Sequence, residues 1–250
     1  NPLSVVFTNG DLKIDEYQNI SREFGYSETS FVYYSEENKA LKVRSFTPTG
    51  FEVDGAGHNL LGAVCAAVLK KIDIFSQQAG ETYVIMKDGP IHLRVDLDNK
   101  LPVVKMLQRP AVFGESVYPE IIVGALGIEL TDLSIQHFAP TVVQTEVAHL
   151  MVELKDITVL NRIKPENKSL IEISKKYDFE GFYCFAIAEA DCSIAQARFF
   201  NPLIGIDEDA ATGTAAGPLA GILCDKQIIQ QNKVSIWRSE ERRVGKECRS

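Results

Sequence analysis

The stretch DEDAATGTAAGPLAGIL, residues 207–223, sets three consecutive acids against small residues that lead into an apolar helical pattern. A second stretch, GAGHNLLGAVCAAVL at 55–69, likewise opens a mostly apolar helix with glycine and alanine. Aligned with each other, the two stretches match mainly small residue for small residue. A helix that is apolar nearly all round is buried on most sides. The pair therefore predicts two related lobes, each with a sheet wrapped around one buried helix.

The sequence around these stretches has similar content in both halves. We expect strands at 5–7, 31–34, 40–47 and 182–190, in TVVQ and AHLMVEL, and in two segments of 82–98 joined at Asp88-Gly89. Helices are expected at 15–25, where Gly25 closes the helix, and at 55–71, 165–178 and 212–225. The strand pattern lapses at 105–115, which predicts a linker there, with an N-terminal lobe at 1–106 and a C-terminal lobe at 107–238.

Composition narrows the classes of function. The chain has 250 residues, is 45% hydrophobic and carries a net charge of -8. An acidic protein does not favour nucleic acid, whose phosphates need a basic face. No apolar run reaches the length of about 18 residues that a membrane-spanning helix needs, and no signal-peptide pattern is present. We therefore expect a small-molecule partner, with no nucleic acid and no membrane.

Cysteine and histidine usage gives no sign of a disulfide framework or a metal site. The five cysteines, at 65, 184, 192, 224 and 248, form no CxxC pair. An odd number of unpaired cysteines is typical of reduced thiols in a cytoplasmic protein. The four histidines, at 58, 92, 137 and 149, show no metal-ligand spacing. The sequence therefore predicts a cytoplasmic protein without a bound metal.

The ends of the chain have an unusual pattern. The last residues, SEERRVGKECRS at 239–250, have no apolar periodicity and follow SIWR, which resembles a strand cut short. We interpret 239–250 as a non-native tail and exclude it from the fold. The chain also starts at Asn1-Pro2, which predicts that its native N-terminus is missing.

Glycines open both small-residue helices. A helix N-terminus carries about half a positive charge and free N–H groups, and glycine lets a ligand approach them. Each opening is thus a candidate site for a carboxylate or phosphate. Known phosphate motifs fail, because Leu60 stands where GxGxxG needs its third glycine and no GxxxxGK[ST] occurs. The alternative is that Gly57 and Gly213 only relieve crowding at the start of a buried helix.

Four polar residues near these openings have both a structural and a chemical interpretation. His58 is either a satisfied structural residue or a proton-handling group, and Glu208 and Asp209 are either helix caps or working carboxylates. Glu28 comes just before an apolar strand. Partial desolvation there would raise its pKa toward that of a general acid or base, whereas an exposed carboxylate at a strand end would have only a structural role.

Four motifs that occur in order along the chain favour the chemical interpretation of these residues. NPLSVVF, SETSFV, GAGHNLLGAV and DEDAATGTAAGPL resemble the motifs of the phenazine-biosynthesis (PhzF-like) isomerase family, from residue 1 to about residue 223. The resemblance implies an α+β fold of the diaminopimelate epimerase-like type. Its two lobes are related by a pseudo-twofold, each a curled, mostly antiparallel sheet around a central helix, with the active site in the cleft. It also implies a homodimer and a cofactor-independent isomerase acting on a small acid.

The resemblance also assigns roles to residues. Glu28, in the SET motif, is implied to be the general acid/base, and His58 and Asp209 are implied to join it in catalysis. The motif positions implied to bind the substrate are Asn1, Gly57, Asn59, Gly213 and Thr214.

The sequence departs from the family pattern in several places. Ala210 replaces a proline and Thr214 replaces a serine, which keeps a hydroxyl at that position; the closing region of the family is absent. Epimerase relatives use two cysteines, at positions that match Ala56 and Thr212 here, so a two-thiol mechanism is disfavoured. Two alternatives stay open: a non-catalytic small-molecule binder on the same fold, and an epimerase or racemase variant.

Overall fold

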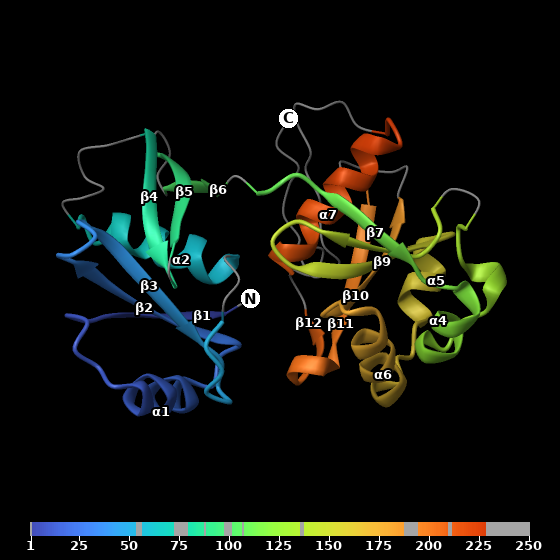
Figure 1. The fold of residues 1–250 in the computed structure, drawn as a ribbon, viewed down its shortest axis with the longest axis horizontal. Coiled ribbons are helices and arrows are strands. Elements are labelled where there is room, and N and C mark those ends of the chain that lie inside the picture. The colour runs from blue at the N-terminus through green and yellow to red at the C-terminus, as the bar shows by residue number, and fades with distance from the viewer. Residues whose placement is uncertain are drawn as a thin grey trace. The chain divides into compact units, whose positions relative to one another are not determined.

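The fold comprises two compact units, Asn1–Gln108 and Arg109–Ser250, each with a six-stranded sheet (Figure 1). It is known from a computed structural model, which describes residues 2–53, 57–72, 80–87, 89–97, 102–106, 108–135, 138–187, 195–209 and 212–228. Asn1, Ala56, Ala210 and the predicted tail at 239–250 lie outside the described residues. None of the described helices is both long enough and apolar enough to cross a membrane.

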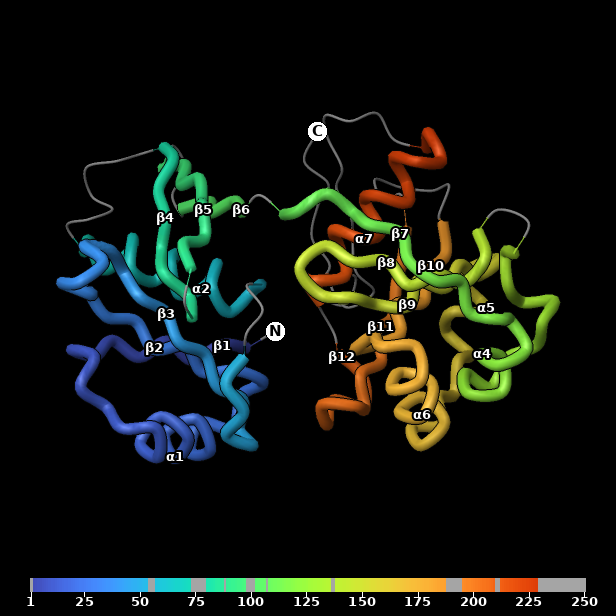
Figure 2. The backbone as a smooth tube through the Cα atoms, in the orientation of Figure 1, coloured from blue at the N-terminus to red at the C-terminus, as the bar shows by residue number. Residues whose placement is uncertain are grey.

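The first unit is built on one mixed sheet. Its elements are β1 (Leu3–Phe7), α1 (Ile14–Phe24), β2 (Glu28–Ser35), β3 (Ala40–Phe46), α2 (His58–Leu69), β4 (Gly80–Met86), β5 (Gly89–Asp96) and β6 (Val103–Met106). The strands follow one another in chain order across the sheet, as the tube in Figure 2 shows. The pairs β1–β2 and β3–β4 are parallel, and the other neighbouring pairs are antiparallel.

Successive side chains of β2 point to opposite faces of the sheet, so neighbouring residues contact different helices. Phe31 packs on one face with Tyr17 of α1 and with Phe46. Val32 belongs to the core cluster that contains the buried face of α2. Side chains two residues apart in a strand share a face. Glu28 is therefore on the α2 face of the sheet, at the point where β2 begins.

The second unit has a sheet in the order β12-β11-β10-β9-β8-β7, in which only the described pair β9–β10 is parallel. Its strands are β7 (Val112–Ser116), β8 (Thr141–Gln144), β9 (Ala148–Leu154), β10 (Gly181–Ile187), β11 (Ala195–Asn201) and β12 (Ile206–Asp209). Its helices are α4 (Pro119–Leu126), α5 (Ile157–Arg162), α6 (Asn167–Tyr177) and α7 (Gly213–Asp225), with 3-10 turns η1 (Leu130–Asp132) and η2 (Pro202–Ile204).

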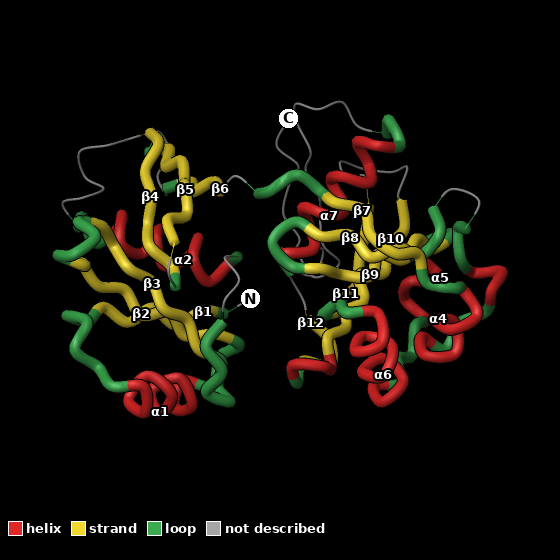
Figure 3. Tube along the Cα trace, in the orientation of Figure 1, coloured by secondary structure: helices red, strands yellow, loops and turns green. Residues whose placement is uncertain are grey.

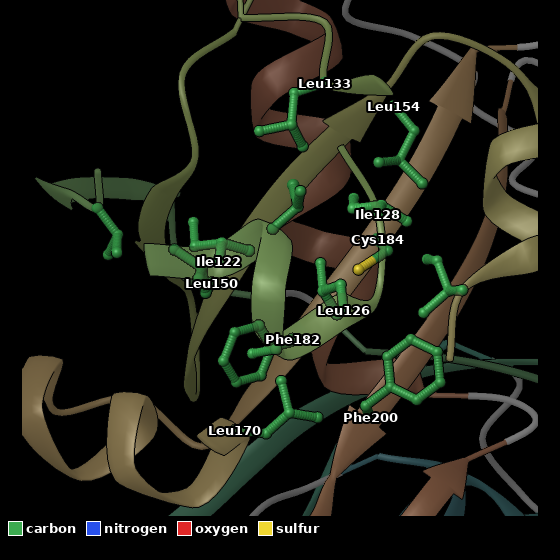
Figure 4. Close-up of a cluster of buried hydrophobic side chains, with 14 of the residues drawn as sticks. Ile122, Leu126, Ile128, Leu133, Leu150, Leu154, Leu170, Phe182, Cys184 and Phe200 are labelled. Atoms are coloured by element: carbon green, nitrogen blue, oxygen red, sulfur yellow. The ribbon is translucent and has the colours of Figure 1, made fainter. Parts of the chain in front are cut away.

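The inner strands β9, β10 and β11 of this second sheet are buried on both faces. In β10, Phe182 and Cys184 belong to a core shared with residues of α4, α5 and α6 (Figure 4). These three helices are the red segments labelled α4, α5 and α6 in Figure 3. The alternate residues Tyr183 and Phe185 belong to a different core, which contains the buried side of α7. A strand covered on both faces is apolar without interruption. This explains why FYCFAI is an unbroken apolar run.

The predicted linker at 105–115 contains the boundary between the two units, at Gln108/Arg109, but is longer than the connection between strands β6 and β7. Part of it, Val112–Ser116, is strand β7, which pairs with β8 at the edge of the second sheet. All five residues of β7 are exposed. An exposed edge strand does not need the apolar alternation by which strands are recognised in a sequence.

Close packing around α7 predicts a cost for one small substitution. A Cβ added at Gly221 would overlap Cβ of Ala111, which has no side-chain rotation to make room. We expect Gly221→Ala to lower the free energy of unfolding by about 1–2 kcal/mol, after allowing for the better helix propensity of alanine. Urea unfolding followed by circular dichroism measures this change.

The matched control is Gly62→Ala in α2. There the added Cβ would lie 2.5 Å from Cδ2 of Leu3, the movable end of a flexible side chain. We expect this variant to lose less stability than Gly221→Ala. An equal or larger loss in the Gly62 variant would contradict the explanation.

Candidate active site

In the first unit, a carboxylate and an imidazole meet at the N-terminus of α2. Glu28 is the first residue of β2 and His58 the first residue of α2. Glu28 Oε2 lies 3.5 Å from His58 Nε2, and the side chains are 18% and 28% exposed. The two facing atoms themselves are buried. This geometry suits proton transfer, because the pair is shielded from bulk water while part of each side chain stays accessible.

Buried hydroxyl groups connect β2 to the first turn of α2. Ser30 Oγ donates to the backbone oxygen of Asn59 at 3.2 Å and lies 2.8 Å from Ser45 Oγ on β3. Both serines are fully buried. Because Ser30 shares its face with Glu28, this contact fixes the start of the strand beside the helix end, and so places Glu28 near His58.

Asn59 shapes the opening of α2 from the inside. Its side-chain Oδ1 accepts from the backbone N–H of Gly57 at 2.8 Å and of Leu60 at 2.9 Å. Asn59 is itself only 1% exposed. The Gly57 N–H belongs to the helix opening that was predicted as a carboxylate or phosphate site, and it already donates to Asn59. Substrate binding by Gly57 and Asn59 stays a prediction.

In the second unit, the three acids of β12 have different surroundings. Asp207 Oδ1 accepts from Asn167 Nδ2 of α6 at 2.7 Å. Glu208 accepts two hydrogen bonds from Arg198, at 2.7 Å from Nε and 2.8 Å from NH2. Asp209 Oδ2 instead accepts from Thr212 Oγ1, across 2.5 Å, at the N-cap of α7. Of the three acids, Asp209 is therefore the one that contacts the start of α7.

Arg198 connects this strand to a more distant part of the second unit. Besides the bidentate pair with Glu208, its NH1 group donates to the backbone oxygens of Leu160 at 3.0 Å and Ile163 at 3.2 Å. These carbonyls lie at the end of α5, where the last carbonyls of a helix lack partners within it. Arg198 thus joins β12 to α5 through one planar group with well-defined geometry.

Thr214, in the first turn of α7, contacts a buried histidine. His149 Nε2 lies 3.0 Å from Thr214 Oγ1. The imidazole is 1% exposed and packs edge to face on Phe199, with the ring centroids 5.0 Å apart. Burial lowers the pKa of His149 from its ordinary value of 6.5 to about 3, so the ring is neutral at physiological pH.

His149 was not predicted from the sequence as a site residue. Unlike His58, it was considered only as a metal ligand. The available signal was the alternation in AHLMVEL: His149 shares a face with Met151, which belongs to the α7 core, whereas Leu150 belongs to the opposite one. A polar ring on that face of a buried strand requires a partner.

The lowered pKa of His149 predicts a specific loss of stability in acid. The unfolded chain takes up a proton near pH 6.5 and the folded chain only near pH 3. The contribution of the neutral His149 ring to folding stability is therefore complete above about pH 6.5, and it decreases as the pH falls from there toward 3. From pH 7 to pH 5 we expect a loss of about 2 kcal/mol from this residue. Urea unfolding of the wild type and of His149→Gln at both pH values measures it.

The difference between the two proteins isolates the histidine, because other titrating groups are common to both. The glutamine variant should lack this part of the pH dependence. Equal losses in both proteins would show that His149 does not titrate as its burial requires.

The described cysteines of α2 and α7 lie away from the starts of these helices. Cys65 and Cys224 are inside α2 and α7 rather than at their N-termini, and Thr212 stands at the opening of α7. Within the described ranges, no group of three or more His, Cys, Asp or Glu side chains is placed to hold a metal ion.

Each unit therefore combines a largely antiparallel sheet, a buried small-residue helix and titratable side chains at the start of that helix. This is the architecture of the diaminopimelate epimerase-like class of enzymes. The chain belongs to the phenazine biosynthesis-like (PhzF) family, whose model matches residues 1–247.

Curated relatives and a solved structure agree with this assignment. An uncharacterized isomerase of Clostridium acetobutylicum is 33% identical over 234 residues, which cover 91% of this chain and 75% of that protein. The trans-2,3-dihydro-3-hydroxyanthranilate isomerase of Pseudomonas aeruginosa is 29% identical over 247 residues, covering 96% and 81%. A PhzF-family phenazine biosynthesis protein of Bacillus anthracis has a TM-score of 0.79 at 25% identity, covering 90% and 74%.

The predicted family, α+β fold class and isomerase class are thus confirmed. The roles of the individual site residues, the division at 106/107, homodimerisation and a cytoplasmic location stay predictions.

Proposed function

We propose that this protein is a cofactor-independent isomerase that moves a proton between carbons of a small acid, with Glu28 as the general acid/base. The observation that carries the proposal is the pair formed by Glu28 Oε2 and His58 Nε2, 3.5 Å apart with both facing atoms buried. A carboxylate held against an imidazole can both accept and return a proton.

The proposed reaction conserves all atoms and involves no net redox change. Glu28 takes a proton from a carbon next to an acid or imine group, and the electron pair of that C–H bond spreads into the neighbouring unsaturated group. The proton then returns at a different carbon. His58 and Asp209 are assigned to orienting the substrate or relaying the proton, and backbone N–H groups at helix N-termini favour the negative charge that develops.

The comparison with P. aeruginosa suggests the first compound to test. That relative is a trans-2,3-dihydro-3-hydroxyanthranilate isomerase, and this compound is a small carboxylic acid with C–H bonds beside unsaturated carbon. We propose acids of this class as substrates. The negatively charged carboxylate suits the positive end of a helix such as α2 or α7.

Proton exchange with solvent tests the proposal. The protein is incubated in D₂O with trans-2,3-dihydro-3-hydroxyanthranilate, and the recovered compounds are analysed by mass spectrometry and NMR. We expect an isomerised product that carries deuterium at carbon. Binding without isomerisation or exchange would instead support a non-catalytic binder, the alternative raised by the sequence.

A further inference from the structure

We propose that His149 is a positioning residue for the opening of α7, where its Nε2–H donates to Thr214 Oγ1 and commits the Thr214 hydroxyl to act as a donor toward an anionic ligand. The inference deepens the proposed function and rests on it, because the anion in question is the carboxylate of the acid substrate. His149 lies on β9, outside the motifs that led to the site.

The geometry of the pair is well defined. His149 Nε2 and Thr214 Oγ1 are 3.0 Å apart, which is hydrogen-bond distance. The imidazole is nine-tenths buried or more and is held edge to face by Phe199. Thr214 itself is only partly buried, so a ligand can reach its hydroxyl while the histidine behind it stays out of contact with solvent.

The burial of the other ring nitrogen decides where the hydrogen sits. Nδ1 of His149 is buried and has no hydrogen-bond partner among the described residues. A neutral imidazole carries one N–H and one lone pair. A buried N–H without a partner is rarer in proteins than an acceptor left partly unsatisfied. The hydrogen is therefore on Nε2, which makes His149 the donor and Thr214 Oγ1 the acceptor in this contact.

The direction of this hydrogen bond changes what Thr214 offers. A hydroxyl has one hydrogen to donate and lone pairs to accept. With a lone pair engaged by His149, the Thr214 hydrogen is directed to another acceptor. Thr214 is the second residue of α7, where the helix dipole and the free backbone N–H groups favour negative charge. A carboxylate is an acceptor of the required kind.

A purely structural role would not require a polar ring at this position. His149 faces an apolar core that includes Met151, Tyr183 and Phe199, and an aromatic hydrocarbon there could make the same ring contact with Phe199. Burying an imidazole carries a desolvation cost that an apolar ring avoids. The hydrogen bond to Thr214 is the described contact that a phenyl ring could not replace.

The first test reads the tautomer directly and needs no turnover. Long-range ¹H–¹⁵N NMR on the whole ¹⁵N-labelled protein distinguishes a protonated ring nitrogen from an unprotonated one. We expect His149 to show a protonated Nε2 and an unprotonated Nδ1 across the neutral pH range. A hydrogen on Nδ1, or a doubly protonated ring, would overturn the proposal.

The second test measures whether the pair acts on an anion. Anthranilate, a stable aromatic carboxylate, is titrated into the wild type and into His149→Phe, His149→Gln and Thr214→Val. We expect His149→Phe to bind about tenfold more weakly, the effect of one lost hydrogen bond. His149→Gln should recover much of the affinity, because its terminal amide can again donate to Thr214. In the Thr214→Val background, His149→Phe should have little further effect.

The outcomes separate this inference from the proposed function. His92→Phe, the same change at an exposed histidine of β5, should bind anthranilate like the wild type. The proposal is overturned if His149→Phe binds like the wild type, if its effect persists without the Thr214 hydroxyl, or if anthranilate leaves the Thr214 resonance of the wild type unchanged. If the wild type failed to isomerise trans-2,3-dihydro-3-hydroxyanthranilate, that result would count against the proposed function. It would not alter the NMR results for His149.

Discussion

Glu28→Gln should reduce kcat by about 10²–10⁴-fold while substrate binding stays close to that of the wild type. Glutamine keeps the size of the side chain and its place beside His58 Nε2, which lies 3.5 Å from Oε2 in the wild type. It cannot accept a proton from carbon at neutral pH. Steady-state kinetics with trans-2,3-dihydro-3-hydroxyanthranilate, with affinity measured separately by calorimetry, would show a loss in kcat rather than in binding.

The same sheet provides a control for the change of charge. Glu81→Gln removes one negative charge from an exposed position on β4, in the same unit. This variant should retain wild-type kinetics. Near wild-type turnover in Glu28→Gln would remove Glu28 from the mechanism, and with it the central assignment of the proposed function.

Asp209→Asn should lower kcat/KM by about 10–100-fold. Hydrogen bonds made by a charged group contribute about 1.5–3 kcal/mol, which corresponds to this range of rates. Asparagine can still accept from Thr212 Oγ1, the contact that Asp209 makes at the N-cap of α7. The expected loss therefore reflects the missing charge rather than a disrupted helix start. Initial-rate measurements over a range of substrate concentrations test it.

A neighbouring acid on the same strand provides a matched control for Asp209→Asn. Asp207→Asn changes the same group two residues earlier, where the side chain accepts from Asn167 of α6. Because asparagine can keep that hydrogen bond, we expect almost unchanged kinetics. If the two variants lost activity equally, the effect would belong to the charge of β12 as a whole and not to Asp209.

The buried helices were predictable from sequence because their signals are local. Small and apolar residues on nearly all sides of α2 and α7 indicate helices enclosed by other elements, and the structure has them at His58–Leu69 and Gly213–Asp225. Gly25 was expected to close α1, and it does so in the left-handed conformation with φ of 66°. Such features depend on a few neighbouring residues, so they can be predicted without knowledge of the fold.

Elements that depend on distant contacts were missed. Strand β7 is fully exposed and exists through its pairing with β8, so its sequence carries no buried pattern. Helix α5 has only six residues and begins at the Asp156 cap. A segment that short is stable through packing more than through its own propensity. β11 and β12 also escaped prediction.

The candidate site was predictable in its parts but not in its contacts. The motifs indicated Glu28, His58 and Asp209, yet the sequence could not show that Asn59 accepts from the Gly57 N–H. The motifs assigned Asp209 rather than Glu208, but they could not show that Arg198 holds Glu208 while Thr212 donates to Asp209. His149 was missed for the same reason, since its partner is 65 residues away in the chain.

The hydrogen bonds that Arg198 makes to two separate elements affect how variants far from the active site are interpreted. One guanidinium group joins the carbonyls that end α5 to the residue immediately before Asp209. A substitution that unwinds the end of α5 would therefore release a restraint on β12, and its kinetic signature would resemble that of a change at the carboxylate itself. In a survey of random variants, substitutions near Leu160 and Ile163 would then lower activity although these residues take no part in the chemistry. Their effect would be transmitted by the side chain of Arg198 alone.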